Sequence, residues 1–229
     1  MASELEIRFY RTAKERLLSA GFATEINWQL EREFGAFTET DLLRESAWVI
    51  LCSGFREAVV RRCFDLISLC FCDWESAADI CNAAALCRAT ALTTFGNRQK
   101  IDAILRTAAL VNELGFAQIK RRILQNPIRS VQVLPYIGPV TAFHLAKNLG
   151  YATAKPDRHL VRLAGALGRK NPHELCSSLS EATGDPIQVV DLVLWRYAER
   201  FGEKPGTGKT GDRRDVPQFP CVSTQPRPG

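Results

Sequence analysis

Apolar residues recur at helical spacing along most of the chain. The segments 4–21, 38–52 and 97–115 each repeat apolar positions three and four residues apart, which is the pattern of an amphipathic helix. Similar spacing continues through 74–92 and 187–201, and we find no convincing strand alternation. We therefore predict an all-α fold.

Residues that favour helix ends mark where these predicted helices begin and end. Asn97 is a candidate N-cap and Gly115 a candidate stop for the helix between them. The pairs Asn171-Pro172 and Asp185-Pro186 each match the pattern of an N-cap followed by proline at the first helical position. We expect two late helices to begin there.

The length and composition are those of a globular protein. The chain has 229 residues, 46% hydrophobic and 24% charged, enough for one or two domains with a sizeable core. No apolar run approaches the roughly 18 residues that span a bilayer. The mixed N-terminus is not a secretory signal, so the expected location is the cytoplasm.

The eight cysteines do not indicate a disulfide framework or a metal centre. No Cys-x-x-Cys pair occurs, and only three histidines are present. Six cysteines fall in apolar helical text, where a thiol behaves as a small hydrophobe, so we expect buried free thiols and no metal site. These six are Cys52, Cys63, Cys70, Cys72, Cys81 and Cys87.

The net charge of +5 is unevenly distributed. Residues 97–130 carry seven basic and two acidic side chains, and residues 145–170 carry six basic and one acidic. Residues 1–60 carry seven basic and ten acidic side chains. Basic blocks of this kind indicate a surface that faces a polyanion, although a solvated basic helix face would give the same pattern.

The composition changes at Gly202, after which glycine, proline and polar residues dominate. We predict a flexible tail over 202–229, with nonspecific DNA contact as an alternative role. The tail contains Gly208-Lys209-Thr210, but a phosphate-binding loop would need glycine at 203, where the residue is Glu203. No strand precedes the motif, which argues against nucleotide binding.

The stretch 134–150 predicts a tight turn between two helices. Pro135 cannot continue a helix, Gly138 permits unusual backbone angles, and Pro139 suits the first position of a new helix. The free N–H groups of that new helix could bind a phosphate, or the turn could be purely structural.

Asp157 stands at the start of the next predicted helix, directly after Lys155-Pro156. An aspartate there is a good N-cap, and a catalytic aspartate would look the same in the sequence.

Together these two features resemble a known family. Leu134-Pro135-x-Ile137-Gly138-x-x-Thr141-Ala142 followed by Pro156-Asp157-Arg158-His159-Leu160 is similar to the helix-hairpin-helix DNA glycosylase superfamily, which includes endonuclease III and the 8-oxoguanine glycosylases. The resemblance covers roughly residues 1–201. It implies a central lobe over 22–151 with the hairpin at 134–142, and a second lobe formed by 1–21 and 152–201.

The resemblance also implies a mechanism. Such proteins grip the backbone of double-stranded DNA with the hairpin and flip one nucleotide into a cleft between the lobes. Asp157 would stabilise the cationic sugar or activate a water at C1′. His159 would lie beside this sugar or on a helix surface. The implied DNA contacts are Tyr136, Gly138, Val140, Thr141, Lys147, Lys155, Arg158, His159 and Arg162.

Several departures from the family pattern refine this expectation. Val140 stands where bifunctional members carry their Schiff-base lysine, so we expect a monofunctional glycosylase, with Lys147 or Lys155 as possible substitutes. Tyr136 replaces the first hairpin glycine. Phe55 or Arg56 would fill the DNA gap. Only Cys176 and Cys221 lie downstream, so no iron–sulfur cluster is expected.

The expected activity is hydrolytic excision of a modified or damaged base by a monomer. Two alternatives stay open: an inactive DNA-binding module of the same fold, or a relative that acts on RNA or another nucleobase conjugate in antiviral defence. The sequence does not identify the base.

Overall fold

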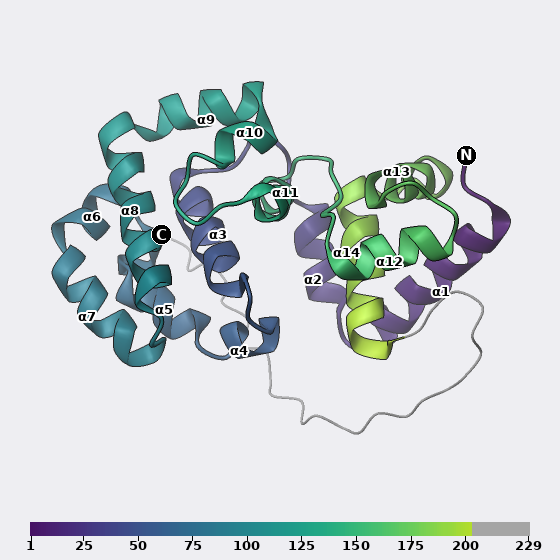
Figure 1. Ribbon diagram of the computed structural model, residues 1–229, viewed down its shortest axis with the longest axis horizontal. Helices are drawn as coiled ribbons and strands as arrows, with labels where there is room; N and C mark the ends of the chain where they lie inside the picture. Colours follow the sequence, from purple (N-terminus) through teal and green to yellow (C-terminus); the bar gives the residue numbers. More distant parts are fainter. Residues whose placement is uncertain (203–229) are drawn as a thin grey trace, which may run out of the picture.

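The chain folds into helices arranged as two groups (Figure 1). The computed structural model describes residues 1–202, and within these residues there are fourteen α-helices, one 3-10 helix and no strand. The all-α prediction is confirmed. The elements are α1 (Glu4–Ser19), α2 (Ala23–Leu30), α3 (Glu39–Cys52), α4 (Glu57–Arg61), α5 (Phe64–Cys70), η1 (Cys72–Trp74), α6 (Ala77–Asn82), α7 (Ala84–Thr94), α8 (Arg98–Leu114), α9 (Phe116–Gln125), α10 (Pro127–Val131), α11 (Pro139–Asn148), α12 (Arg158–Ala166), α13 (Pro172–Thr183) and α14 (Ile187–Phe201).

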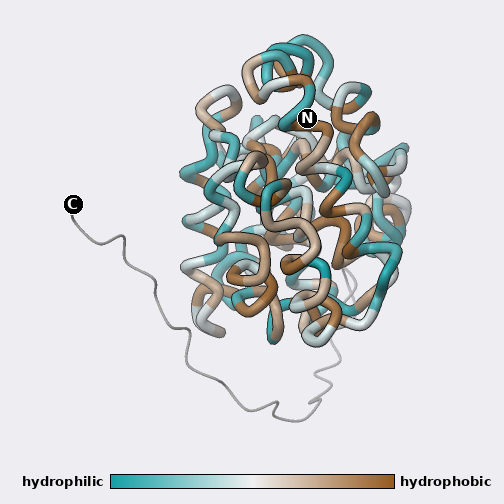
Figure 2. Tube along the Cα trace, turned by 90° about the vertical axis from the view of Figure 1, so that its left-hand side faces the viewer, coloured by the Kyte–Doolittle hydropathy of each residue, from teal (hydrophilic) through white to brown (hydrophobic). Residues whose placement is uncertain are grey.

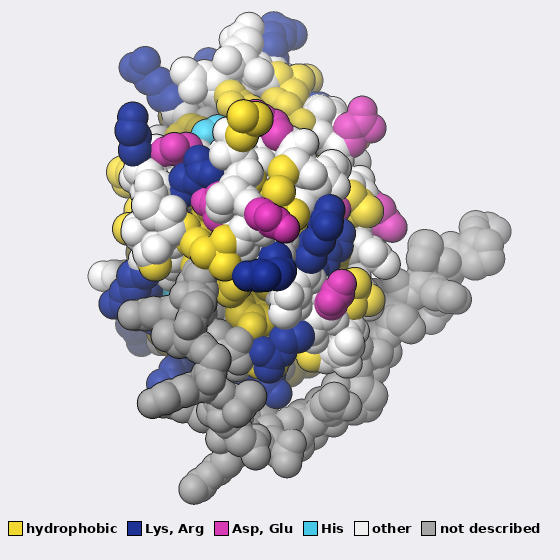
Figure 3. Space-filling view, turned by 90° about the vertical axis from the view of Figure 1, so that its right-hand side faces the viewer, with side chains coloured by type: hydrophobic (Ala, Val, Ile, Leu, Met, Phe, Trp, Pro, Cys, Tyr) yellow, Lys and Arg dark blue, Asp and Glu magenta, His cyan; other side chains and the backbone are white. Residues whose placement is uncertain are grey.

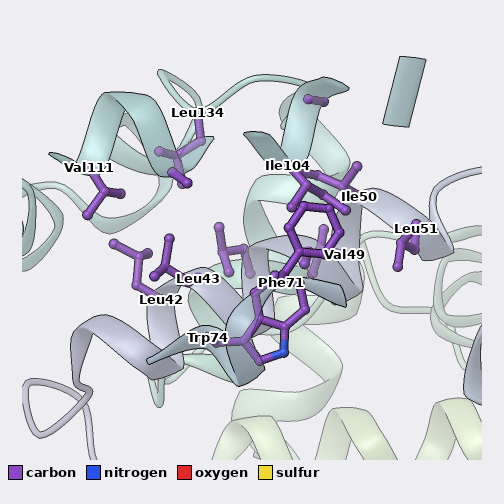
Figure 4. Packing of buried hydrophobic residues seen from close by; sticks show 14 of the residues in the cluster. Leu42, Leu43, Val49, Ile50, Leu51, Phe71, Trp74, Ile104, Val111 and Leu134 are labelled. Atoms are coloured by element: carbon purple, nitrogen blue, oxygen red, sulfur yellow. The ribbon is translucent and has the colours of Figure 1, made fainter. Parts of the chain in front are cut away.

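The first lobe comprises α3 to α11 around one hydrophobic core. The apolar face of α3 supplies Leu42, Ile50 and other buried residues at its centre (Figure 4). The Phe71 and Trp74 rings stack with centroids 5.1 Å apart, and the Trp74 indole donates a hydrogen bond to Ser68 Oγ at 2.8 Å. Brown and teal residues alternate along the helices of this lobe in Figure 2, as amphipathic helices require.

The second lobe comprises α1, α2, α12, α13 and α14 around a separate core. Tyr10 and Leu17 of α1 and Ile26 of α2 pack there with residues from the last three helices. The predicted boundary after residue 21 differs from this packing, because α2 shares its core with α14 rather than with α3. The residue pattern of α2 does not indicate which lobe the helix packs against.

Polar contacts join the two lobes. The Gln29 side chain donates to the Lys147 carbonyl at 3.1 Å. Arg196 of α14 pairs with Glu57 of α4 at 2.7 Å, and Arg61 of α4 lies 3.3 Å from Glu25 of α2. The segment 149–157 then carries the chain from α11 to α12, between the two cores.

The helix ends follow the predicted signals with two exceptions. Asn97 and Asn171 cap their helices, and Gly115 ends α8. Asp185 does not cap α14, which begins after Pro186, because its carboxylate instead accepts hydrogen bonds from Tyr10 at 2.5 Å and Lys14 at 2.7 Å. The predicted helix over 74–92 is also divided, since α6 and α7 are separated at Ala83.

The cysteines of the described residues are free thiols, of which Cys87 and Cys176 are buried and the others half-buried. Within residues 1–202 no group of three or more His, Cys, Asp and Glu side chains is placed to hold a metal ion. No helix in this range is both long enough and apolar enough to cross a membrane. Of the predicted tail, only Gly202 lies within the described residues.

Candidate active site and nucleic-acid interface

The hairpin joins α10 to α11 as the sequence predicts. Gly138 is the N-cap of α11 and Pro139 its first residue. The Gly138 N–H donates to Thr141 Oγ1 at 2.7 Å, and the Thr141 hydroxyl donates to the Gly138 carbonyl at 3.1 Å. Thr141 therefore stabilises the turn through two hydrogen bonds to Gly138. Its hydroxyl proton is used in one of these bonds, so it is not free to bind a phosphate.

Tyr136 occupies the first hairpin position in a left-handed conformation, with φ of 69°. Such a conformation is strained for a residue other than glycine. Its ring centroid lies 4.9 Å from the ammonium of Lys100, a buried residue of α8. The same ammonium donates to the carbonyls of Leu51 and Ser53 at the end of α3, at 3.1 and 2.6 Å. This cation–π contact helps to hold the hairpin against α3 and α8.

Asp157 is the N-cap of α12. Its Oδ1 accepts the N–H of His159 at 2.9 Å and the N–H of Leu160 at 3.1 Å. Oδ2 takes no hydrogen bond from the described residues and lies 3.9 Å from Lys155 Nζ. The side chain is 13% exposed. One oxygen thus fixes the carboxylate, and the other remains available for chemistry.

Lys155 lies beside Asp157 with its backbone fixed by the second lobe. Its N–H donates to Asp191 Oδ1 of α14 at 2.7 Å, and its side chain is 21% exposed. Burial lowers the pKa of Lys155, and the ammonium of Lys147 acts in the same direction, whereas Asp157 and Asp191 oppose the shift. The hydrogen bond from the Lys155 N–H to Asp191 therefore ties the loop 149–157 to α14.

Lys147 does not fit its predicted role as a DNA contact. Its ammonium forms a buried ion pair with Asp191, and its side chain is only 6% exposed. Contact with a phosphate would leave the Asp191 carboxylate buried without its cation, which is strongly unfavourable. Lys147 is instead the link that holds α11 to α14.

Two further side chains stand near this cluster. His144 of α11 is half-buried, and burial followed by the charges of Lys155 and Lys147 holds its pKa well below the ordinary value, so the ring is neutral. Burial, followed by Glu57, raises the pKa of the Cys52 thiol to about 12, so it is protonated near neutral pH. Cys52 is therefore a poor nucleophile.

The remaining predicted contacts are on the surface or at its edge. Val140, Arg158 and Arg162 are exposed, and His159 is half-buried with Nε2 accepting from Arg158 Nε at 3.4 Å. Phe55 is 42% exposed and its ring centroid lies 5.2 Å from the Lys100 ammonium. On the face shown in Figure 3, basic side chains are dispersed among acidic and apolar ones and form no continuous patch.

The sequence did not single out Asp191 or His144 as parts of this site. Of these residues, Asp191 could have been noticed, because an acidic residue within the apolar run of α14 indicates a buried charge that needs a partner. His144 lies four residues after Val140 on α11, so the two share a face, but a lone histidine has no distinctive pattern. A surface hollow between α1 and Phe201 and another between α5 and α7 contain none of the predicted site residues.

The fold matches that of a known enzyme. The crystal structure of the 8-oxoguanine DNA glycosylase of Thermotoga maritima aligns with a TM-score of 0.57 and 20% sequence identity, covering 87% of this chain and 99% of that one. Neither a protein-family model nor a curated protein sequence matches the chain. The likeness shows that this chain shares the fold of that structure, in agreement with the predicted all-α fold.

Proposed function

We propose that this chain is a DNA N-glycosylase that releases a modified base by hydrolysis. Asp157 carries the proposal. It combines a carboxylate oxygen anchored on a helix N-terminus with a second oxygen free of hydrogen bonds, on the segment between the two lobes. The shared fold supports the proposal, because the similar structure is that of a DNA glycosylase.

The chemistry follows from the position of this charge. Breaking the bond between C1′ and the base leaves positive charge on the sugar, which a nearby carboxylate stabilises most in a partly buried site. The same carboxylate can accept a proton from the water that attacks C1′. Asp157 Oδ2 would serve either role without releasing the helix cap, because Oδ1 alone holds the cap.

Substrate binding would use the hairpin and the first turn of α12. The exposed side chains of Arg158 and Arg162 are available to phosphates, and the Tyr136 ring is exposed beside the turn. We propose double-stranded DNA with an everted nucleotide as the substrate, bound by one copy of the chain. The base could be 8-oxoguanine or another altered base, since the residues above contact sugar and phosphate rather than a base edge.

Base release would not be coupled to strand cleavage. Val140 has no amine with which to displace the base from C1′, so water is the proposed nucleophile. The product would be an intact strand with an abasic site.

A glycosylase screen tests this proposal. Duplexes with single altered bases, beginning with 8-oxoguanine, are incubated with wild type and with Asp157→Asn, and abasic sites are revealed by alkali. Asparagine is an equally good N-cap, so α12 should remain intact. We expect base release by wild type and a loss of roughly 10²- to 10⁴-fold in the variant. Binding without release on every duplex would indicate a non-catalytic module, and equal release by the variant would remove Asp157 from the mechanism.

A further inference from the structure

We propose that Cys72 and Cys87 form a reversible disulfide bond when the chain is exposed to a peroxide. The two thiols belong to different elements, η1 and α7, and both line the surface hollow between α5 and α7. This hollow contains none of the predicted site residues, so the inference stands independently of the proposed function. It assigns an oxidative modification site to the first lobe.

The hollow gathers three of the seven thiols that the described residues contain, namely Cys70, Cys72 and Cys87. Burial raises the pKa of the Cys87 thiol to about 11, and the charge of Cys72 and a side-chain hydrogen bond with it are the next causes. Cys70 acts in the same direction but is the weakest cause. Because one sulfur affects the ionisation of another in this way only at short range, Cys72 is the natural partner of Cys87.

The backbone at Cys72 is held in an unfavourable conformation by the core. Cys72, Asp73 and Trp74 have φ angles of 54°, 49° and 65°, a left-handed run that residues other than glycine avoid. Such a run persists only where the surrounding structure imposes it. Here the buried Trp74 ring stacks on Phe71 and donates a hydrogen bond to Ser68. The core therefore fixes the backbone of Cys72, so little further freedom is lost when its sulfur forms a bond.

Access to the hollow differs between the two thiols. Cys72 is half-buried, whereas Cys87 is buried. Leu66, Leu69 and Leu86 are exposed and also line the hollow, so its walls are largely apolar. A small uncharged oxidant such as hydrogen peroxide can approach apolar walls at little cost, whereas a charged reagent would lose hydration there. Peroxide should therefore react first with Cys72.

The reaction balances with peroxide as the oxidant. The Cys72 sulfur loses its proton and attacks one peroxide oxygen, the O–O bond breaks, and the other oxygen leaves as water. Cys72 is then a sulfenic acid, which carries no charge, so one cause of the raised pKa of Cys87 is removed. The Cys87 sulfur loses its proton and attacks the Cys72 sulfur, and the S–O bond breaks to release a second water. Two thiols have then given two electrons to the peroxide, and an added dithiol returns them.

Peptide mapping of the oxidised full-length chain tests the inference directly. The reduced protein, which has eight thiols, is treated with hydrogen peroxide and its remaining thiols are blocked. Cleavage after Arg62, Glu75 and Arg88 then places Cys72 and Cys87 on separate peptides. We expect the number of free thiols to fall by two and these peptides to be joined by a bond that fragmentation locates at the two cysteines. Dithiothreitol should separate them again.

Matched variants assign a role to each sulfur. Cys72→Ala should lose the joined peptides. Cys87→Ala should also lose them, but its Cys72 sulfenic acid has no partner and should accumulate, which labelling with dimedone detects. Cys81→Ala is the control, because Cys81 is a half-buried thiol of α6 that does not line the hollow, and it should crosslink as wild type does. Oxidation should also raise the denaturation midpoint of wild type but not of Cys87→Ala, because a disulfide restricts the unfolded chain.

The wild-type map decides the inference even if a variant does not fold. A reversible bond between Cys72 and Cys87 supports it, whether or not any base is released in the glycosylase screen. Wild type that keeps all its thiols, or that accumulates sulfinic acid at Cys72 without a crosslink, overturns it. A bond that joins either sulfur to Cys70 or to another cysteine overturns it as well.

Discussion

The Lys147 ammonium and the Asp191 carboxylate form a buried ion pair that joins α11 of the first lobe to α14 of the second. The other oxygen of Asp191 accepts the Lys155 N–H at 2.7 Å, so the pair also holds the loop that leads to Asp157. One aspartate thereby connects the hairpin helix, the loop and the core of the second lobe.

Removal of one partner from this pair should be costly. We expect Asp191→Asn to lower the free energy of unfolding by about 3–5 kcal/mol, because Lys147 would keep a buried charge without its counter-ion. Denaturant unfolding measures the change. Asp102→Asn is the matched control, since Asp102 pairs with Arg88 on the surface, and its stability should stay near that of wild type. Equal effects at the two positions would contradict the buried role.

Arg162 provides a test of the DNA surface. It is exposed on α12 one turn beyond Arg158, so we expect Arg162→Gln to weaken binding equally on all duplexes and to reduce the salt slope of log K by about 1. Fluorescence anisotropy over a range of salt concentrations gives both quantities. Arg8→Gln, at an exposed position of α1, should change neither. If the salt slope of log K is unchanged in Arg162→Gln, Arg162 does not contact the DNA.

Gly150 should not tolerate a side chain. Its φ is 92°, and a Cβ would lie 2.7 Å from the backbone of Glu33 and of Phe34. We expect Gly150→Ala to lower the free energy of unfolding by more than about 2 kcal/mol, through backbone strain and overlap together. Gly165→Ala in α12 meets open space and should stabilise the protein by about 0.5–1 kcal/mol. Thermal unfolding of the two variants compares them, and a stable Gly150→Ala would refute the close approach.

Acid should weaken the attachment of α1 through Glu6. The hydrogen bond from Arg169 is the main cause that holds the pKa of Glu6 at about 2, below its ordinary 4.5, although burial opposes it. This stabilisation is fully present above pH 4.5 and is lost as the pH falls toward 2. Wild type should therefore be more stable than Glu6→Gln at pH 7, and the difference should shrink across that window. Glu4→Gln, on the exposed side of α1, serves as control; a difference that is constant with pH would exclude the linkage.

Local chemistry made much of this fold predictable. Asn97, Asn171 and the Gly138-Pro139 turn act through hydrogen bonds within a few residues, so their helix ends follow from the sequence alone. Asp157 was recognisable for the same reason, as a cap at the start of α12.

Long-range partners could not be predicted in this way. Lys147 has the sequence environment of a surface lysine, and only the approach of α14, 44 residues later, buries it. Asp185 has the sequence environment of a cap, yet Tyr10 and Lys14 on α1 take its carboxylate. The side of the fold that α2 joins depends on a neighbour about 165 residues away, which no local pattern specifies.

The shared core of the first and last helices also sets an order of events during synthesis. Tyr10, Leu17 and Ile26 emerge from the ribosome early, but their partners on α14 are translated only after the whole first lobe. The first lobe, whose core lies between Phe37 and Leu149, can close while the chain is still growing. The N-terminal helices can complete their core only after α14 has been made, so the Asp157 segment takes its final position after the first lobe has closed.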